Sequence, residues 1–100
     1  MNNLLFGTAG IPMSTNGNTM QGIQDVKKLG LGAMELEFVR SINISKEKAP
    51  LIKKTAQDSN VVLTCHAPYF INLNSLEKVK LEASKKRILD SARRAYECGA

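Results

Sequence analysis

The sequence predicts an α/β fold in which three strand–helix units alternate along the chain and form a parallel sheet. Short apolar runs of strand length alternate with longer segments whose apolar residues recur at helical spacing. The connections are short enough for right-handed crossovers, which place successive strands in parallel. A content of 43% hydrophobic and 23% charged residues is typical of a globular chain and excludes an extensively disordered one.

The first unit is expected to contain a strand at residues 4–6 and a helix after Asn18. The apolar run at residues 4–6 leads into a loop that contains glycine. Asn18 is a favourable N-cap, and Gln21 stands three residues later in the capping-box position. Every third residue of the helix is apolar, which predicts one buried side formed by Met20, Ile23, Val26 and Leu29.

The second strand is expected at residues 33–39, and its two faces differ in chemistry. Met34, Leu36 and Phe38 share one face, whereas Glu35 and Glu37 share the other. Strands of a parallel sheet are normally apolar on both faces, so the glutamates require solvent or a polar interior. Two interpretations remain open: an edge strand with one wet face, or a strand whose Glu37, near the carboxyl end, points into a polar cleft.

Two further helices and one strand complete the predicted pattern. Ser45 can cap a helix that begins near Lys48, because Pro50 is tolerated only in the first turn; its apolar side would comprise Leu51, Ile52 and Ala56. The third strand, residues 61–65, leads to His66, and Pro68 stops it. A long helix capped by Asn74 or Ser75 would extend to about Cys98, with an apolar stripe of Leu81, Ile88, Ala92, Ala95 and Gly99.

His66 is the only histidine of the chain and follows an apolar, β-branched strand. At the carboxyl end of a parallel strand, an imidazole can bind a metal, transfer a proton or make a structural hydrogen bond. Zinc would require three or four ligands, so other groups such as Glu37 would have to join it. Cys65 cannot easily contribute, because neighbouring residues of a strand point to opposite faces, and a buried core role is predicted for it.

Charge and loop chemistry allow, but do not establish, a polyanionic partner. The net charge is +5, and lysine and arginine residues cover one face of the last predicted helix. Tyr69, in a polar loop, has a ring that can stack on a sugar or base, whereas Asn72 can fix the loop through backbone hydrogen bonds. Two unpaired cysteines, without a signal peptide or a membrane-length apolar run, favour a reduced, cytoplasmic chain with no membrane association.

The segment His66-Ala67-Pro68-Tyr69-Phe70-Ile71-Asn72-Leu73 resembles the H-x-x-Y-x-I-N-L signature of endonuclease IV. The resemblance extends more loosely over the whole chain, and that looser part is shared with sugar isomerases and epimerases of the same barrel superfamily. It implies that residues 1–100 form the amino-terminal portion of a single TIM-type (β/α)8 barrel, truncated before the fourth strand. A complete barrel has about 250 residues, so the barrel would be incomplete.

The resemblance implies a zinc-dependent phosphodiesterase that cleaves double-stranded DNA at apurinic or apyrimidinic sites during base excision repair. His66 would bind one zinc ion of a trinuclear cluster. Tyr69 and Asn72 would belong to the DNA-contacting loop. Arg40 lies near the place where family members insert an arginine into the duplex, although the local sequence differs, and we expect it near the DNA. Glu37 has no counterpart in the better-known bacterial members; we expect it near the substrate, and it points to a divergent branch or to a sugar-isomerase relative. The other zinc ligands of that family lie on later strands, so the isolated chain is expected to be inactive.

Two alternatives to the nuclease remain open at this stage. One is a sugar or sugar-phosphate isomerase or epimerase of the same superfamily, which would use Glu37 and His66 with one divalent metal. The other is a non-catalytic chain that associates with itself through the unpaired edges of its sheet.

Overall fold

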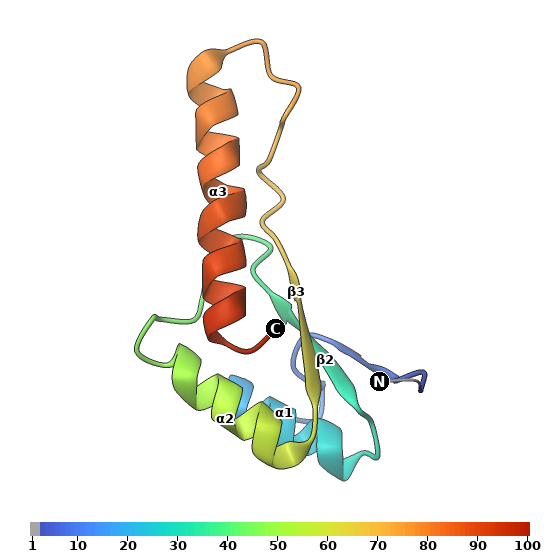
Figure 1. Ribbon diagram of the computed structural model, residues 1–100. Helices are drawn as coiled ribbons and strands as arrows, with labels where there is room; N and C mark the ends of the chain where they lie inside the picture. The colour runs from blue at the N-terminus through green and yellow to red at the C-terminus, as the bar shows by residue number, and fades with distance from the viewer. Residues whose placement is uncertain (1–2) are drawn as a thin grey trace.

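The computed structural model describes residues 3–100 and contains a three-stranded parallel sheet with a helix after each strand (Figure 1). The strands are hydrogen-bonded in the order β1-β2-β3, which is also their order along the chain. This arrangement confirms the predicted α/β fold of parallel β-α units. The elements are β1 (Gly7–Ala9), α1 (Thr19–Lys28), β2 (Ala33–Glu37), α2 (Ala49–Ser59), β3 (Val62–His66) and α3 (Lys78–Glu97).

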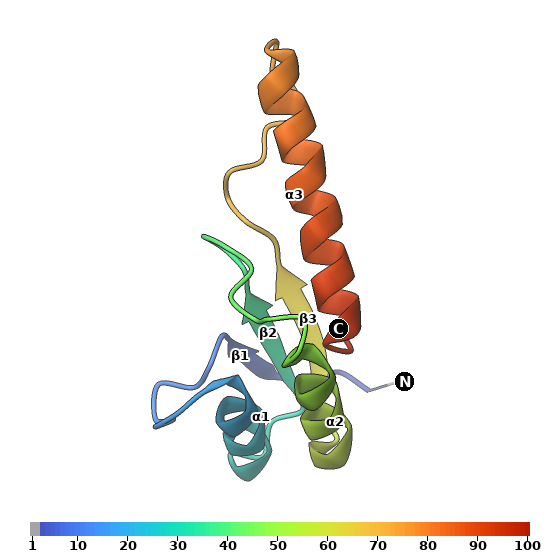
Figure 2. The same cartoon turned by 90° about the vertical axis from the view of Figure 1, so that its left-hand side faces the viewer.

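The hydrophobic core lies between the sheet and the helices, which gather on one side of it (Figure 2). Its largest fully buried side chains come from α1, β2 and the residue just after β2, and Cys98 at the end of α3 joins them. Burying such side chains is the main favourable contribution to folding. The fully buried residues are Phe38, Ile23, Met34, Val26 and Cys98.

The first strand lies three residues later than the sequence predicts. Leu4 and Phe6 are 80% and 68% exposed, and β1 pairs through Gly7–Ala9 with the first half of β2. A Cβ atom at position 7 would lie only 2.0 Å from the carbonyl oxygen of Ala33. The prediction of residues 4–6 was wrong because glycine was interpreted as a loop residue, whereas here it permits the close approach of two strands.

Two apolar side chains that the helical spacing places in the core are exposed instead. Leu29 is 57% exposed because α1 ends at Lys28 and Leu29 is its C-cap. Leu51 is 51% exposed, while Ile52 and Ala56 on the same helix are buried as predicted. The N-cap of α1 is confirmed, since the Asn18 side chain accepts a hydrogen bond from the Gln21 amide at 3.1 Å.

Helix α3 begins later than predicted, and the residues that it buries most are not those of the predicted stripe, of which Leu81, Ile88 and Ala95 are partly buried. It starts at Lys78, and Ser75 caps only a preceding turn by accepting a hydrogen bond from the Glu77 amide. Its buried residues are Ser84, Ser91 and the C-cap Cys98, whereas Ala92 of the predicted stripe is exposed. Small side chains at heptad spacing let this helix pack closely. None of the described helices combines the length and apolar character needed to cross a membrane.

The second strand is central in the sheet, which excludes the edge-strand interpretation of its glutamates. It pairs with β1 on one side and with β3 on the other. The molecule is elongated, with a radius of gyration of 14.8 Å against about 13 Å for a compact domain of this length. Figure 1 shows α3 extending well past the carboxyl end of β3, and among residues 3–100 no helix lies on the opposite face of the sheet.

Replacing Ile23 by alanine should destabilise the fold far more than replacing Leu29, although both are apolar and belong to one predicted stripe. Ile23 is fully buried, and such truncations cost about 2–5 kcal/mol. Leu29→Ala, at a largely exposed side chain, should change the free energy of unfolding by about 0.5 kcal/mol or less. Urea unfolding followed by circular dichroism measures both; equal losses would contradict the observed end of α1.

Candidate functional site at the carboxyl end of the sheet

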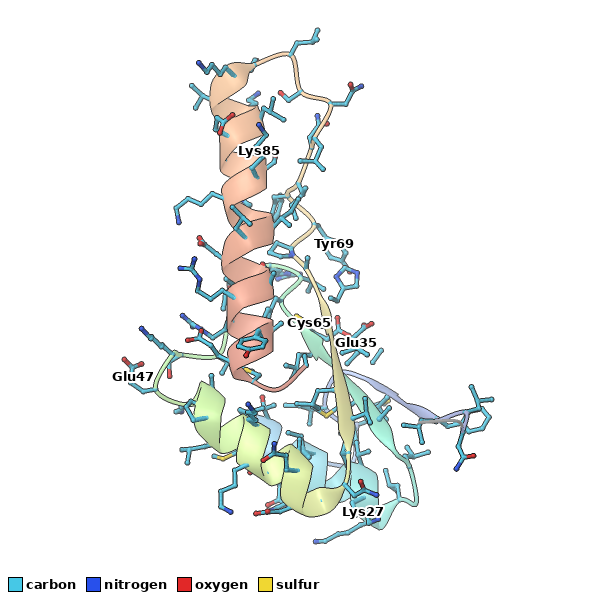
Figure 3. The ribbon with its side chains drawn as sticks, viewed as in Figure 1. Lys27, Glu35, Glu47, Cys65, Tyr69 and Lys85 are labelled. Atoms are coloured by element: carbon cyan, nitrogen blue, oxygen red, sulfur yellow. The ribbon has the colours of Figure 1, made fainter. Side chains whose placement is uncertain are left out.

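The face of the sheet that no helix covers is polar toward its carboxyl end. Residues of β2 alternate, so the burial of Met34 and Leu36 against the helices directs Glu35 and Glu37 to the other face. The strand register places Glu37 opposite His66 and Glu35 opposite Thr64. In Figure 3, Glu35 and Tyr69 project from the sheet on the side away from α2 and α3. Two carboxylates, a hydroxyl and an imidazole therefore share one small area.

His66 is the last residue of β3, and its ring is oriented by two neighbours. The Nδ1 atom lies 2.7 Å from the carbonyl oxygen of Ala67. A carbonyl can only accept, so this hydrogen bond requires a proton on Nδ1 and leaves the lone pair of neutral Nε2 available to a metal or a proton. The Tyr69 ring meets the imidazole in a T-shaped arrangement with centroids 5.2 Å apart.

Glu37 is held in an environment that disfavours its charge. The neighbouring Glu35 carboxyl raises the pKa of Glu37 through a shared hydrogen bond and like charge, burial adds to the rise, and His66 opposes it. The Oε1 atom of Glu37 is buried and has no hydrogen-bond partner within residues 3–100. An unpaired buried carboxylate oxygen is costly, so this atom is the point of the site where a ligand or cation would be stabilised most.

A hollow of about 140 Å³ is lined partly by the two glutamates and partly by the apolar residues Met34, Leu36 and Ile44. The loop after β1 forms one wall: the amide of Gly10 donates a hydrogen bond to the carbonyl oxygen of Glu35 at 2.9 Å. On the other side, the Asn43 side chain donates to the backbone carbonyl of Glu37 at 3.3 Å. The volume is enough for a few water molecules or a hydrated ion, and the two hydrogen bonds fix the main chain that carries the glutamates.

The other predicted site residues lie on the loops beyond the strands. Tyr69 is 67% exposed, and its amide donates to the carbonyl oxygen of Val39. Arg40 is exposed beside a separate hollow with Phe70 and Arg87. Asn72 faces α3: its side chain accepts from the Asn74 amide and its own amide donates to Ser84. The structure therefore brings Glu37, His66 and Tyr69 together, while Asn72 takes the loop-fixing role.

The described residues contain a donor pair and not a complete metal centre. No group of three or more histidine, cysteine, aspartate or glutamate side chains in residues 3–100 lies close enough to enclose a metal ion. Zinc requires three or four ligands. Nε2 of His66 and the unpaired Oε1 of Glu37 are atoms of a kind that zinc accepts as ligands, but on their own they are too few to hold it.

Cys65 belongs to the opposite face, as its position in the strand predicts. It is aligned with Leu36 and packs against the hydrophobic core. Burial, with smaller contributions from Cys98 and the two glutamates, raises the pKa of the Cys65 thiol to about 11. Burial likewise raises the pKa of Cys98, and both cysteines are free. Neither thiol has the lowered pKa that a nucleophile needs.

These features define an α/β chain with an open parallel sheet and a polar cluster where β2 and β3 end. Residues 23–100 match the family described as Xylose isomerase-like TIM barrel. The chain is also 40% identical, over 96% of its own length, to an uncharacterized protein of Methanocaldococcus jannaschii, of which the match covers 34%. The chain therefore belongs to the xylose isomerase-like TIM barrel family, which includes apurinic/apyrimidinic endonucleases and isomerases. It spans about a third of the length of this curated relative.

Both thiols should react slowly with iodoacetamide in the folded protein. At pH 8 a thiol with a pKa near 11 is about 0.1% thiolate, against roughly a quarter for an ordinary cysteine. We expect labelling of Cys65 to be at least about 100-fold slower than in the same protein unfolded in urea, and labelling of the buried Cys98 also to be slowed. Mass spectrometry of the two cysteine peptides measures the rates, and fast labelling of Cys65 would reveal an activated nucleophile.

Replacing Glu37 by glutamine should stabilise the protein at neutral pH. A pKa raised above the ordinary 4.5 means that the folded state binds the proton more tightly than the unfolded state. Protonated Glu37 therefore contributes to stability below pH 4.5, and this contribution is lost as the pH rises through the higher pKa of the folded state. In EDTA, the urea midpoint of Glu37→Gln should be higher than that of the wild type at pH 7, and the two midpoints should become equal near pH 4.

Glu47→Gln is the matched control for this comparison, because Glu47 is exposed on the loop before α2. It removes the same charge and should leave the pH dependence of the urea midpoint unchanged. A Glu37→Gln variant that is less stable than the wild type at pH 7 would show that the carboxylate is well paired in solution.

Proposed function

We propose that this chain supplies the amino-terminal part of a zinc-dependent phosphodiesterase that cleaves DNA at abasic sites, as in endonuclease IV. The observation that carries the proposal is the pairing of His66 and Tyr69 at the carboxyl end of β3. These two residues are the H and Y of the H-x-x-Y-x-I-N-L signature. Membership of a barrel family that includes apurinic/apyrimidinic endonucleases supports it.

His66 would act as one zinc ligand through Nε2, because its Nδ1 is held by the Ala67 carbonyl. Clustered zinc ions, when bound, would lower the pKa of an attacking water and neutralise charge on the phosphate. Glu37 would serve as an additional negative group beside the imidazole. The remaining ligands would come from later strands, so the isolated chain should have no activity.

Double-stranded DNA with an abasic site would meet the protein at the loops beyond β2 and β3. The largely exposed Tyr69 offers a ring for stacking on a base or sugar. Arg40 and the net charge of +5 would favour the phosphate backbone. Asn72 would contribute indirectly, by shaping the loop that carries Tyr69.

A second function is favoured by one specific observation: Glu37 lies directly opposite His66 in the strand register, and its buried Oε1 is unpaired. A carboxylate and an imidazole side by side are suited to holding one divalent metal and moving a proton on a sugar. A sugar or sugar-phosphate isomerase or epimerase is therefore the alternative. The non-catalytic alternative is self-association through the unpaired edges of β1 and β3.

The test is a chimera in which this chain replaces the matched third of the Methanocaldococcus jannaschii relative. We expect zinc-dependent incision of a duplex that contains one tetrahydrofuran abasic analogue. His66→Ala should lower incision at least about 10–100-fold, the typical effect of weakening a metal site. Tyr69→Ala should mainly weaken binding of the abasic duplex.

Lys54→Ala is the control in the chimera, because Lys54 is exposed on α2 and pairs only with Asp58 one turn away. It should incise like the parent. If the chimera does not incise the duplex but converts a ketose in a reaction that needs a metal and Glu37, the isomerase is the correct function and the nuclease is not. Zinc-dependent incision by the 100-residue chain alone would refute the claim that further ligands are needed.

A further inference from the structure

The loop between β3 and α3, residues 67–77, is held along α3 by two side chains of that helix. The amide of Asn72 donates a hydrogen bond to the Ser84 hydroxyl at 2.9 Å. Arg87 donates from Nη1 to the carbonyl oxygen of Phe70 at 2.8 Å. Ser84 and Arg87 are three residues apart, so they project from the same side of the helix. Figure 1 shows the loop running beside the upper half of α3.

The same stretch of loop is also tied to the sheet. The Tyr69 amide donates to the carbonyl oxygen of Val39 at 2.9 Å, just beyond the end of β2. Backbone groups of Tyr69, Phe70 and Asn72 are thus fixed by partners on two different elements. These attachments lie 12 to 30 residues away along the chain from the groups that they hold.

The Tyr69 side chain itself has little to hold it. It is 67% exposed, and its aromatic contact is the T-shaped one with His66. Packing therefore constrains the ring only weakly, and the backbone on either side of it contributes to its orientation. Ser84 is only 2% exposed, and a buried hydroxyl requires a hydrogen-bond partner. The Asn72 amide is such a partner, so the hydrogen bond satisfies the hydroxyl and also holds the loop.

We propose that Arg87 and Ser84 are positioning residues that hold Tyr69 against His66. Resting on the proposed function, this means that α3 pre-organises the loop that would contact the abasic duplex. A preformed loop binds more tightly because less conformational entropy is lost on contact. Neither residue belongs to the H-x-x-Y-x-I-N-L segment, and both act through the backbone of residues that do.

The single histidine of the chain makes the proposal measurable. A carbon–proton NMR spectrum at pH 8 contains one set of imidazole ring signals, and the Tyr69 ring shifts them. The Tyr69→Leu variant gives the chemical shifts of the His66 signals in the absence of the tyrosine ring. Arg87→Met and Ser84→Ala should each move the His66 signals at least halfway toward that position, while circular dichroism shows an intact fold.

Two further variants separate positioning from general effects. Arg87→Lys keeps a donor and should restore much of the wild-type shift. Arg93→Met removes an equal charge from an exposed residue of α3, one to which the structure of residues 3–100 assigns no hydrogen bond or ion pair, and should leave the shift unchanged. Wild-type His66 signals in Arg87→Met and Ser84→Ala would overturn the proposal.

Anisotropy of a fluorescent abasic duplex at low salt tests the link to function separately. Arg87→Met should bind several-fold more weakly than Arg93→Met, although both lose one positive charge. If the His66 signals move but the two affinities are equal, the positioning stands and the role of Tyr69 in DNA contact fails. If the signals do not move, the positioning role fails whatever the affinities.

Discussion

The division of the sheet into one face covered by helices and one uncovered face is the constraint on which the rest of the structure depends. Met34 and Leu36 enter the core together with Phe38, and a strand can bury alternate residues only by directing the others away from the helices. Glu35 and Glu37 are thereby placed on the uncovered face, and the parallel register brings Thr64 and His66 to the same place. The pattern that forms the core also assembles the polar cluster.

The uncovered face contains groups that are not stabilised by the rest of the structure. Glu37 has an unpaired buried oxygen and a raised pKa, and Val62 on the same face is 39% exposed. Within residues 3–100, β3 is an edge strand with no strand paired to it on the side away from β2. In a closed barrel the same face would be interior, with side chains of further strands opposite it. A cation or donor from such strands would lower the cost of the two adjacent carboxylates, which agrees with a metal-dependent function.

The sequence was sufficient for what depends on the alternation of a strand, and insufficient for what depends on where helices end and on the distances between elements. Alternation correctly assigned the two faces of β2, and it placed Cys65 and His66 on opposite faces of the sheet. Both results follow from the local geometry of a strand. The start of β1 was missed, since a close approach between two backbones decides whether Gly7 is strand or loop. The buried stripe of α3 was missed because Ser84 and Ser91 are polar by composition, and only their hydrogen bonds allow them to be buried.

His66 stands where the two candidate functions diverge, because its two neighbours serve different chemistry. Toward the sheet it adjoins Glu37, which together with a metal would suit proton transfer on a small substrate. Toward solvent it meets Tyr69, whose exposed ring suits a large substrate that approaches from outside the barrel. The backbone of the Tyr69 loop is anchored to Val39, just beyond β2, and to α3, and such anchoring next to an exposed aromatic residue would be of little use for a small enclosed sugar. The anchored loop is thus the feature on which the proposed nuclease rests, and in that proposal the inner carboxylate would tune the imidazole.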